Sequence, residues 1–234
     1  MINSFLLIGQ SNMAGRGSLH EVESIENKDI LMFRENKWVT SEEPLHTDKP
    51  NLAGIGLGMS FAETLQIKFD KKIGLIPCAY GGTSLSQWEK GGKLYANARS
   101  VTMEALKNGT LKGILWHQGE SDSDNLETAQ SYKERFLFFV DNLLSDIGIS
   151  NIPFIVGELG EFLGQYPECS YSNIVNKNLQ ELCIGENPFA YVSSKGLTHN
   201  GDFLHFNAAS LREFGKRYAA AWEESSQKLG ITLE

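Results

Sequence analysis

Short apolar runs rich in β-branched residues alternate along this chain with longer segments of helical period. That alternation is typical of a parallel sheet covered by helices, so we expect an α/β fold. The expected strands are Ser4–Ile8, Ile73–Pro77, Leu111–Trp116, Pro153–Gly157 and Phe189–Val192, with a weaker candidate at Ile30–Phe33. The expected helices are Leu57–Phe69, Leu94–Lys107, Glu127–Asp146, Tyr171–Ile184 and Asn207–Lys228.

The length and the continuity of the pattern indicate one domain over residues 1–234. A chain of 234 residues with 41% hydrophobic residues can bury a substantial core. No repeat, low-complexity tract or linker divides it. The longest irregular stretch, about Arg34 to Gly56, is interpreted as an insertion across the sheet edge or a lid.

The charge pattern excludes one class of partner. The formal net charge is −8 and there is no basic stripe, so we expect no nucleic-acid partner. The chain opens without a basic region, and its first apolar run, Phe5 to Ile8, is too short for a signal peptide or a membrane span. We expect a cytoplasmic protein with no membrane partner, unless a leader peptide has been removed.

Polar residues follow the ends of several expected strands. In open α/β sheets the loops beyond the carboxyl ends of the strands surround the ligand crevice, so residues distant in sequence converge there. The segments concerned are Ser11, Gly81-Gly82-Thr83, His117-Gln118-Gly119-Glu120, and the pair Asp202 and His205.

Ser11, His205 and Asp202 supply the parts of a serine hydrolase. A serine hydroxyl is a poor nucleophile until an imidazole takes its proton, and a carboxylate holds the other ring nitrogen. The alternative interpretations are that Ser11 only caps a helix and that Asp202 caps the helix beginning near Asn207. The segment is not a G-x-S-x-G elbow, because Met13 occupies the place of the second glycine.

Gly81 and Gly82 offer uncovered backbone N–H groups of the kind an oxyanion requires, although most Gly-Gly pairs are only turns. The Gln118 side-chain amide is a further candidate donor, or else it ties down a loop. Tyr80 and Trp88 flank the glycine pair, and aromatic faces near a site often stack on sugar rings, although the alternative for such an aromatic is a place in the core.

The acidic run after the third expected strand is not a calcium loop. Asn125 stands where the sharp turn needs glycine, and Ser131 stands where a bidentate glutamate belongs. A metal site from His117 and Glu120 lacks a second nearby histidine, and the three cysteines form no metal-binding spacing. We therefore expect no metal, and interpret Glu120 as a loop organiser or a second carboxylate near His205.

Four blocks of the chain, in order, resemble those of the SGNH hydrolase superfamily, and within it the branch of sialate O-acetylesterases and acetylxylan-esterase-like carbohydrate esterases. The blocks are Gly9-Gln10-Ser11-Asn12-Met13, Gly81-Gly82-Thr83, Trp116-His117-Gln118-Gly119-Glu120-Ser121-Asp122 and Asp202-Phe203-Leu204-His205-Phe206. The resemblance implies a three-layer α/β/α sandwich whose central parallel sheet has about five strands in flavodoxin-like order.

The resemblance also implies roles. Ser11 is the nucleophile, Asp202 and His205 complete the triad, and the oxyanion donors are Ser11, Gly82 and Gln118, with Gly81 as an alternative to Gly82. The wider superfamily has asparagine in place of Gln118, whereas the carbohydrate-esterase branch shares the glutamine. The expected substrate contacts are Gln10, Trp88 and Glu120.

The residues predict a serine hydrolase, and the resemblance implies that it removes O-acetyl groups from carbohydrates through an acyl-enzyme. Acetylated xylan fragments, sialic acids and related sugars all remain open as substrates. The mechanism needs no metal or organic cofactor. The alternatives are a lipid or thioester hydrolase of the same superfamily and a non-catalytic carbohydrate-binding protein.

Overall fold

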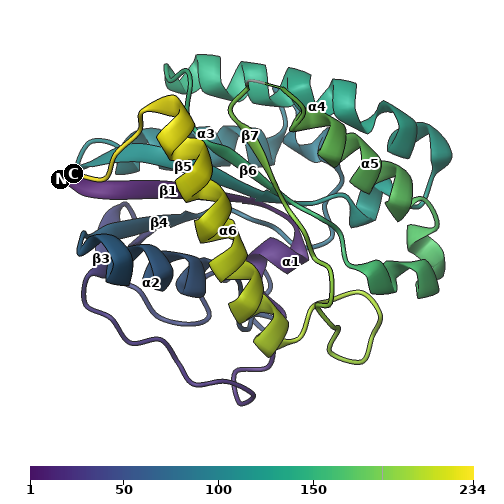
Figure 1. The fold of residues 1–234 in the computed structure, drawn as a ribbon, viewed down its shortest axis with the longest axis horizontal. Helices are drawn as coiled ribbons and strands as arrows, with labels where there is room; N and C mark the ends of the chain where they lie inside the picture. Colours follow the sequence, from purple (N-terminus) through teal and green to yellow (C-terminus); the bar gives the residue numbers. More distant parts are fainter. Residues whose placement is uncertain (186) are drawn as a thin grey trace.

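The computed structural model describes residues 1–185 and 187–234. Its centre is a seven-stranded sheet in the order β3-β2-β4-β1-β5-β6-β7 (Figure 1). The strands are β1 (Ile2–Gly9), β2 (Ile30–Arg34), β3 (Lys37–Thr40), β4 (Ile73–Pro77), β5 (Gly109–His117), β6 (Phe154–Gly157) and β7 (Phe189–Val192). All neighbouring pairs are parallel except β2 and β3.

The predicted α/β fold is confirmed, but the sheet has seven strands instead of about five, and its edge pair β2–β3 is antiparallel. The five strands predicted with most weight have the spatial order β4-β1-β5-β6-β7, which is the flavodoxin order 2-1-3-4-5. The weaker candidate is also a strand, β2. The seventh strand, β3, lies inside the stretch expected to be irregular. It pairs with β2 through the two-residue turn Glu35-Asn36, whose φ angles of 51° and 60° fit a type I′ hairpin.

Helices cover both faces of the sheet (Figure 1). Helices α2 (Gly58–Phe69) and α6 (Ala208–Leu229) pack together on one face. Helices α3 (Lys93–Ala105), α4 (Leu126–Ile147) and α5 (Ser172–Leu182) lie on the other. Their bounds agree with the predicted helices to within two residues. No helix of the described residues combines the length and apolar character needed to cross a bilayer.

Local capping sets the ends of the two longest helices. The side chain of Asn125 accepts hydrogen bonds from backbone N–H groups in the first turn of α4, and Asn207 does the same for α6. Gly148 and Gly230 end these helices in the left-handed conformation, which glycine adopts without a steric penalty.

Alternating side chains of the central strands fill two cores. On β5, Trp116 packs against Phe136 and Phe139 of α4, at ring-centroid distances of 5.3 and 5.2 Å. The next residue, His117, faces α6 and lies 5.4 Å from the ring of Phe214. Period-2 alternation therefore gives each face of the sheet its own aromatic contacts.

The carboxyl ends of β1 and β5 approach each other closely. A Cβ on Gly9 would lie 2.1 Å from the carbonyl oxygen of His117, so only glycine fits where the two strands end. The short helix α1 (Ser11–Ala14) begins directly beyond this contact. Among the described residues, four 3₁₀ helices lie in the loops: η1 (Leu85–Trp88), η2 (Glu120–Asp122), η3 (Glu161–Gln165) and η4 (Pro167–Cys169).

Candidate active site

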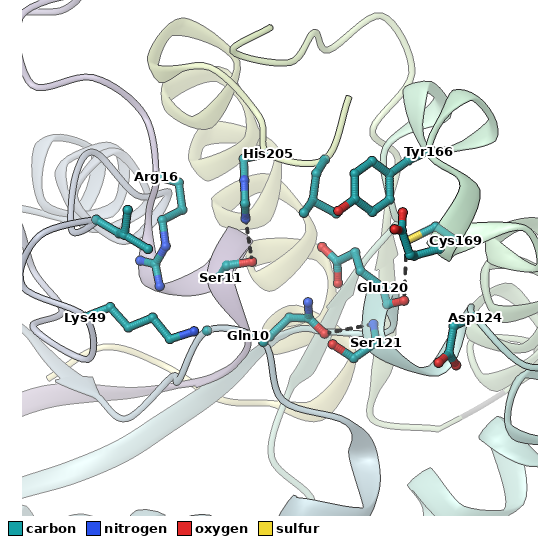
Figure 2. Close-up of a pocket in the computed structure, with 15 residues that line it drawn as sticks. Gln10, Ser11, Arg16, Lys49, Glu120, Ser121, Asp124, Tyr166, Cys169 and His205 are labelled. Atoms are coloured by element: carbon teal, nitrogen blue, oxygen red, sulfur yellow. Dashed lines mark hydrogen bonds between the residues drawn. The ribbon is translucent and has the colours of Figure 1, made fainter. Parts of the chain in front are cut away.

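A pocket of about 400 Å³ opens at the carboxyl edge of the sheet, where β1 and β5 meet (Figure 2). Its size is within the range of small-molecule sites. The residues that line it include Gln10, Ser11, Gly82, Glu120 and His205. Segments from the start, the middle and the end of the chain therefore converge here, as the strand-end pattern predicted.

Ser11, His205 and Asp202 form a continuous hydrogen-bonded chain. His205 Nε2 lies 3.0 Å from Ser11 Oγ, and His205 Nδ1 lies 2.6 Å from Asp202 Oδ2. Because a carboxylate only accepts, Nδ1 carries the proton and Nε2 faces the serine hydroxyl as an acceptor. Figure 2 shows the His205 ring pointing at Ser11.

Asp202 is fixed by the backbone that follows it. Its Oδ1 accepts hydrogen bonds of 2.9 Å from Leu204 N and 2.8 Å from His205 N. Burial by itself raises the pKa of Asp202, but these two bonds and the His205 side chain outweigh it, so the pKa lies below its usual value. The carboxylate is therefore ionised when it faces the imidazole.

Asn12 connects the Ser11 loop to the His205 loop. Its Nδ2 donates to the Leu204 carbonyl at 3.1 Å, and its Oδ1 accepts from Phe206 N at 3.1 Å. The amide therefore holds the backbone on both sides of His205. Asn12 is not among the site residues predicted from the sequence, although a polar residue directly beside a candidate nucleophile is a signal that could have identified it.

Glu120 is buried beside Asn12. Its Oε1 accepts a hydrogen bond of 2.5 Å from Asn12 Nδ2, and His117 Nε2 lies 3.5 Å away. Burial raises the pKa of the Glu120 carboxyl, but the His117 ring and the Asn12 amide lower it by a larger amount. The pKa of Glu120 therefore lies below its usual value. Although Glu120 lines the pocket, its side chain is only 2% exposed, which fits the predicted loop organiser better than a substrate contact.

The glycine pair offers one free N–H group. Gly81 N donates to Asp48 Oδ2 at 2.8 Å, and Asp48 also forms a buried ion pair of 2.6 Å with Arg16. Gly82 lines the pocket with φ +74°, and its N–H has no acceptor among the described residues. Of the two candidate oxyanion donors, Gly82 is therefore the one that is available.

Two predicted site residues do not reach the pocket. Trp88 is fully buried, packs 5.6 Å from the ring of Trp116 and donates to Thr83 Oγ1, so the prediction that it contacts a sugar is wrong. Gln118 is also fully buried. Its Nε2 has two N–H groups and lies within hydrogen-bond distance of three acceptors, Asp122 Oδ2 at 2.6 Å, Thr83 O at 3.0 Å and Gln10 Oε1 at 3.2 Å, which leaves no N–H for an oxyanion. The predicted role of Gln118 is corrected for that reason.

The pocket walls carry opposite charges, which the sequence did not indicate. Arg16 and Lys49 lie on one side of Ser11 in Figure 2, and Glu120 and Asp124 lie on the other. Lys49 belongs to the stretch predicted to be irregular, which thus reaches the site. Within residues 1–185 and 187–234, no group of three or more His, Cys, Asp or Glu side chains is arranged to hold a metal ion.

Known proteins are similar to this chain in both sequence and fold. A probable carbohydrate esterase of Arabidopsis thaliana is 31% identical over 239 residues, covering 93% of this chain and 89% of that protein. The crystal structure of this Arabidopsis protein matches with a TM-score of 0.86 and 30% identity, over 95% of this chain and 98% of the other.

Two more distant structures share the fold. NanS has a TM-score of 0.78 and 17% identity, with 95% of this chain and 97% of NanS covered. A carbohydrate acetylesterase from Xanthomonas citri has a TM-score of 0.70 and 18% identity, with 99% of this chain and 57% of that chain covered.

The sequence profile of one family matches nearly the whole chain, residues 1–224. Its description is carbohydrate esterase, sialic acid-specific acetylesterase. On this match and on the Arabidopsis relative, the chain belongs to this family of carbohydrate esterases and is a carboxylic ester hydrolase.

Proposed function

We propose that this protein is a serine esterase that removes O-acetyl groups from carbohydrates through an acyl-enzyme intermediate. The observation that carries the proposal is the chain from Ser11 Oγ to His205 Nε2 at 3.0 Å and from His205 Nδ1 to Asp202 at 2.6 Å. This is the geometry in which an imidazole takes a serine proton.

In the first step, Ser11 Oγ attacks the acetyl carbonyl carbon and its proton passes to His205 Nε2. The carbonyl π pair moves to oxygen, and Asp202 stabilises the imidazolium. The C–O bond to the sugar then breaks, and the sugar oxygen takes the proton from His205. In the second step water attacks the acetyl-serine by the same route, releasing acetate and restoring the Ser11 hydroxyl.

The backbone N–H groups of Ser11 and Gly82 are the proposed oxyanion donors. Neither has an acceptor among the described residues, whereas the Gly81 N–H is bonded to Asp48. A donor at such a position contributes ~10²- to 10³-fold to kcat.

The character of the pocket favours a small hydrophilic ester. About 400 Å³ lined by Arg16, Lys49, Asp124 and Glu168 suits a sugar acetate better than a long acyl chain, which needs an extended apolar groove. Acetylated xylan fragments and O-acetylated sialic acids are the substrates to compare.

The test is a panel of acetylated sugars with released acetate measured, together with para-nitrophenyl acetate and octanoate. We expect acetate release, little cleavage of the octanoate, and a loss of at least ~10³-fold in kcat for Ser11→Ala. Faster cleavage of the octanoate would favour a lipid or thioester hydrolase. Binding of acetylated glycan without acetate release would indicate a non-catalytic binding protein.

A further inference from the structure

The side chain of Gln10 is nearly buried, yet one end of it has no protein partner. Gln10 is 3% exposed and lines the pocket immediately before Ser11. Its Oε1 accepts hydrogen bonds from Gln118 Nε2 at 3.2 Å and from Ser121 N at 3.3 Å. No acceptor among the described residues is bonded to its Nε2.

The two donors determine which way the Gln10 amide is turned. With oxygen and nitrogen exchanged, the Gln10 NH₂ would face two further donors, so only the observed orientation satisfies the contacts. Figure 2 shows the amide oxygen directed at Ser121 and the nitrogen directed away from it, into the space between Ser11 and Glu120. The free N–H therefore faces the reaction centre.

Gln118 is itself held in one orientation. Its Oε1 accepts from the Tyr132 hydroxyl at 2.9 Å, and its Nε2 donates to Asp122 Oδ2 at 2.6 Å. Asp122 is fixed in turn by Arg135 at 3.2 Å. A polar relay thus runs from Arg135 through Asp122 and Gln118 to Gln10. Buried donors held in this way stabilise developing charge with little reorganisation.

From this arrangement we infer that Gln10 Nε2 is the third oxyanion donor, and that Gln118 acts only by positioning it. The inference rests on the proposed esterase function. Gln10 is then a catalytic residue that binds the former carbonyl oxygen beside the N–H groups of Ser11 and Gly82. Gln118, which was expected from the sequence to donate to the oxyanion, instead contacts Gln10 and is a positioning residue.

Gln10→Glu is the sharpest test. The carboxylate can still accept from Gln118 and Ser121 but has no N–H to donate. We expect kcat on para-nitrophenyl acetate to fall ~10²- to 10³-fold with KM changed less than about threefold, and Gln10→Ala to lose a similar factor. Gln227→Ala, at an exposed glutamine on α6, is the matched control and should keep the parent rate.

The positioning role of Gln118 has its own readout. Gln118→Ala should lower kcat, and its effect should vanish in a Gln10→Ala background, because its only proposed route to the oxyanion is then missing. Thermal midpoints identify variants that fail to fold. Labelling of Ser11 by a fluorophosphonate probe gives a second measurement of oxyanion stabilisation, and Gln10→Ala should slow it by a comparable factor.

The outcomes separate this inference from the proposed function. A Ser11-dependent acetylesterase whose folded Gln10→Ala and Gln10→Glu variants keep kcat within about threefold of the parent overturns the inference alone. A rise in KM with unchanged kcat also overturns it, since it assigns Gln10 to ground-state binding. A wild-type protein that neither cleaves acetyl esters nor reacts with the probe at Ser11 overturns both.

Discussion

Asn12 and Glu120 are hydrogen bonded at 2.5 Å although 108 residues separate them in sequence. The Glu120 carboxylate, which accepts this bond, is buried, and the same Asn12 amide holds the backbone at Leu204 and Phe206. His205 lies between Leu204 and Phe206, so its orientation depends on the Asn12 side chain, which is next to Ser11. The same Asn12 contacts therefore position His205 and stabilise the fold.

We predict that Asn12→Ala lowers both stability and activity. The substitution leaves the buried Phe206 N–H without its acceptor, which costs ~1–3 kcal/mol in the free energy of unfolding. Displacement of His205 should reduce kcat by about 10²-fold, the size expected for a misplacement of roughly 1 Å. Urea unfolding and ester hydrolysis measure the two effects. Asn142→Ala, at a half-buried position on α4, is the control, and a parent-like kcat for Asn12→Ala would refute the positioning role.

Asp202→Asn should lower kcat by about 10⁴-fold while the protein stays folded. The amide can still accept from the Leu204 and His205 N–H groups through its oxygen, so the local backbone is retained. Its NH₂ group, however, would face His205 Nδ1 and force the proton onto Nε2, which then cannot accept from Ser11. The measurement is kcat with a circular dichroism spectrum for each variant. Asp141→Asn, at an exposed position on α4, is the control and should keep the parent rate. A parent-like kcat for Asp202→Asn would show that the Asp202 carboxylate does not orient His205.

The fold follows from the sequence where strands are buried on both sides. Such strands read as continuous apolar runs, and the predicted order around β1 is the observed one. Strand β3 was not predicted because it is an edge strand whose residues are all exposed or half-buried, so it has no apolar run. Its turn, Glu35-Asn36, also lacks the Asn-Gly or Asp-Gly signature of a tight hairpin.

The site was predictable in its convergence but not in every side-chain direction. We expected Ser11, Asp202 and His205 to lie close together because each follows the carboxyl end of a predicted strand. In the structure the three side chains are hydrogen bonded in a chain. Position beside a strand end does not determine which way a side chain turns. Gln118 points into the protein interior toward Tyr132, and Trp88 joins the core beneath the glycine loop.

His46 should make the protein less stable as the pH falls toward 4. Burial lowers the pKa of His46 from 6.5 to about 4 in the folded protein. Between these values the unfolded chain binds a proton that the folded state excludes, so the free energy of unfolding rises with pH across this window and the stability is lost on acidification. The size of the effect is on the order of 3 kcal/mol.

The measurement is urea unfolding of the wild type and His46→Leu across the same pH window. Neither ring nitrogen of His46 makes a well-aligned hydrogen bond within the described part of the chain, and only the backbone of Leu7 and Ala14 lies near enough to interact weakly with the ring, so an apolar replacement removes the titration with little loss of hydrogen bonding. The variant should lose less stability than the wild type on acidification. The same replacement at the exposed His20 should leave the pH dependence unchanged, and parallel curves for wild type and His46→Leu would contradict the assignment.

The ion pair of Arg16 and Asp48 fastens the segment after β3 to the site. Its N–O distance is 2.6 Å, the side chains are 6% and 2% exposed, and Asp48 also accepts from Gly81 N. No local sequence pattern indicates a pair between residues 32 apart. Burial raises the pKa of Asp48, but Arg16 and the Gly81 N–H lower it more, so the net pKa is depressed. The stability it contributes is present above the usual aspartate pKa and is lost as the pH falls through the folded value.

Asp48→Asn should therefore cost ~3–5 kcal/mol in the free energy of unfolding at neutral pH, because the Arg16 charge stays buried without its partner. It should also lower kcat, since the glycine loop that presents the Gly82 N–H loses its anchor at Gly81. Urea unfolding and hydrolysis of an acetyl ester measure the two effects. The matched control is Glu42→Gln, which breaks an ion pair with Arg34 whose side chains are 70% and 30% exposed and should cost no more than about 1 kcal/mol. Equal losses in the free energy of unfolding for Asp48→Asn and Glu42→Gln would show that the buried Arg16–Asp48 pair does not hold the segment after β3 in place.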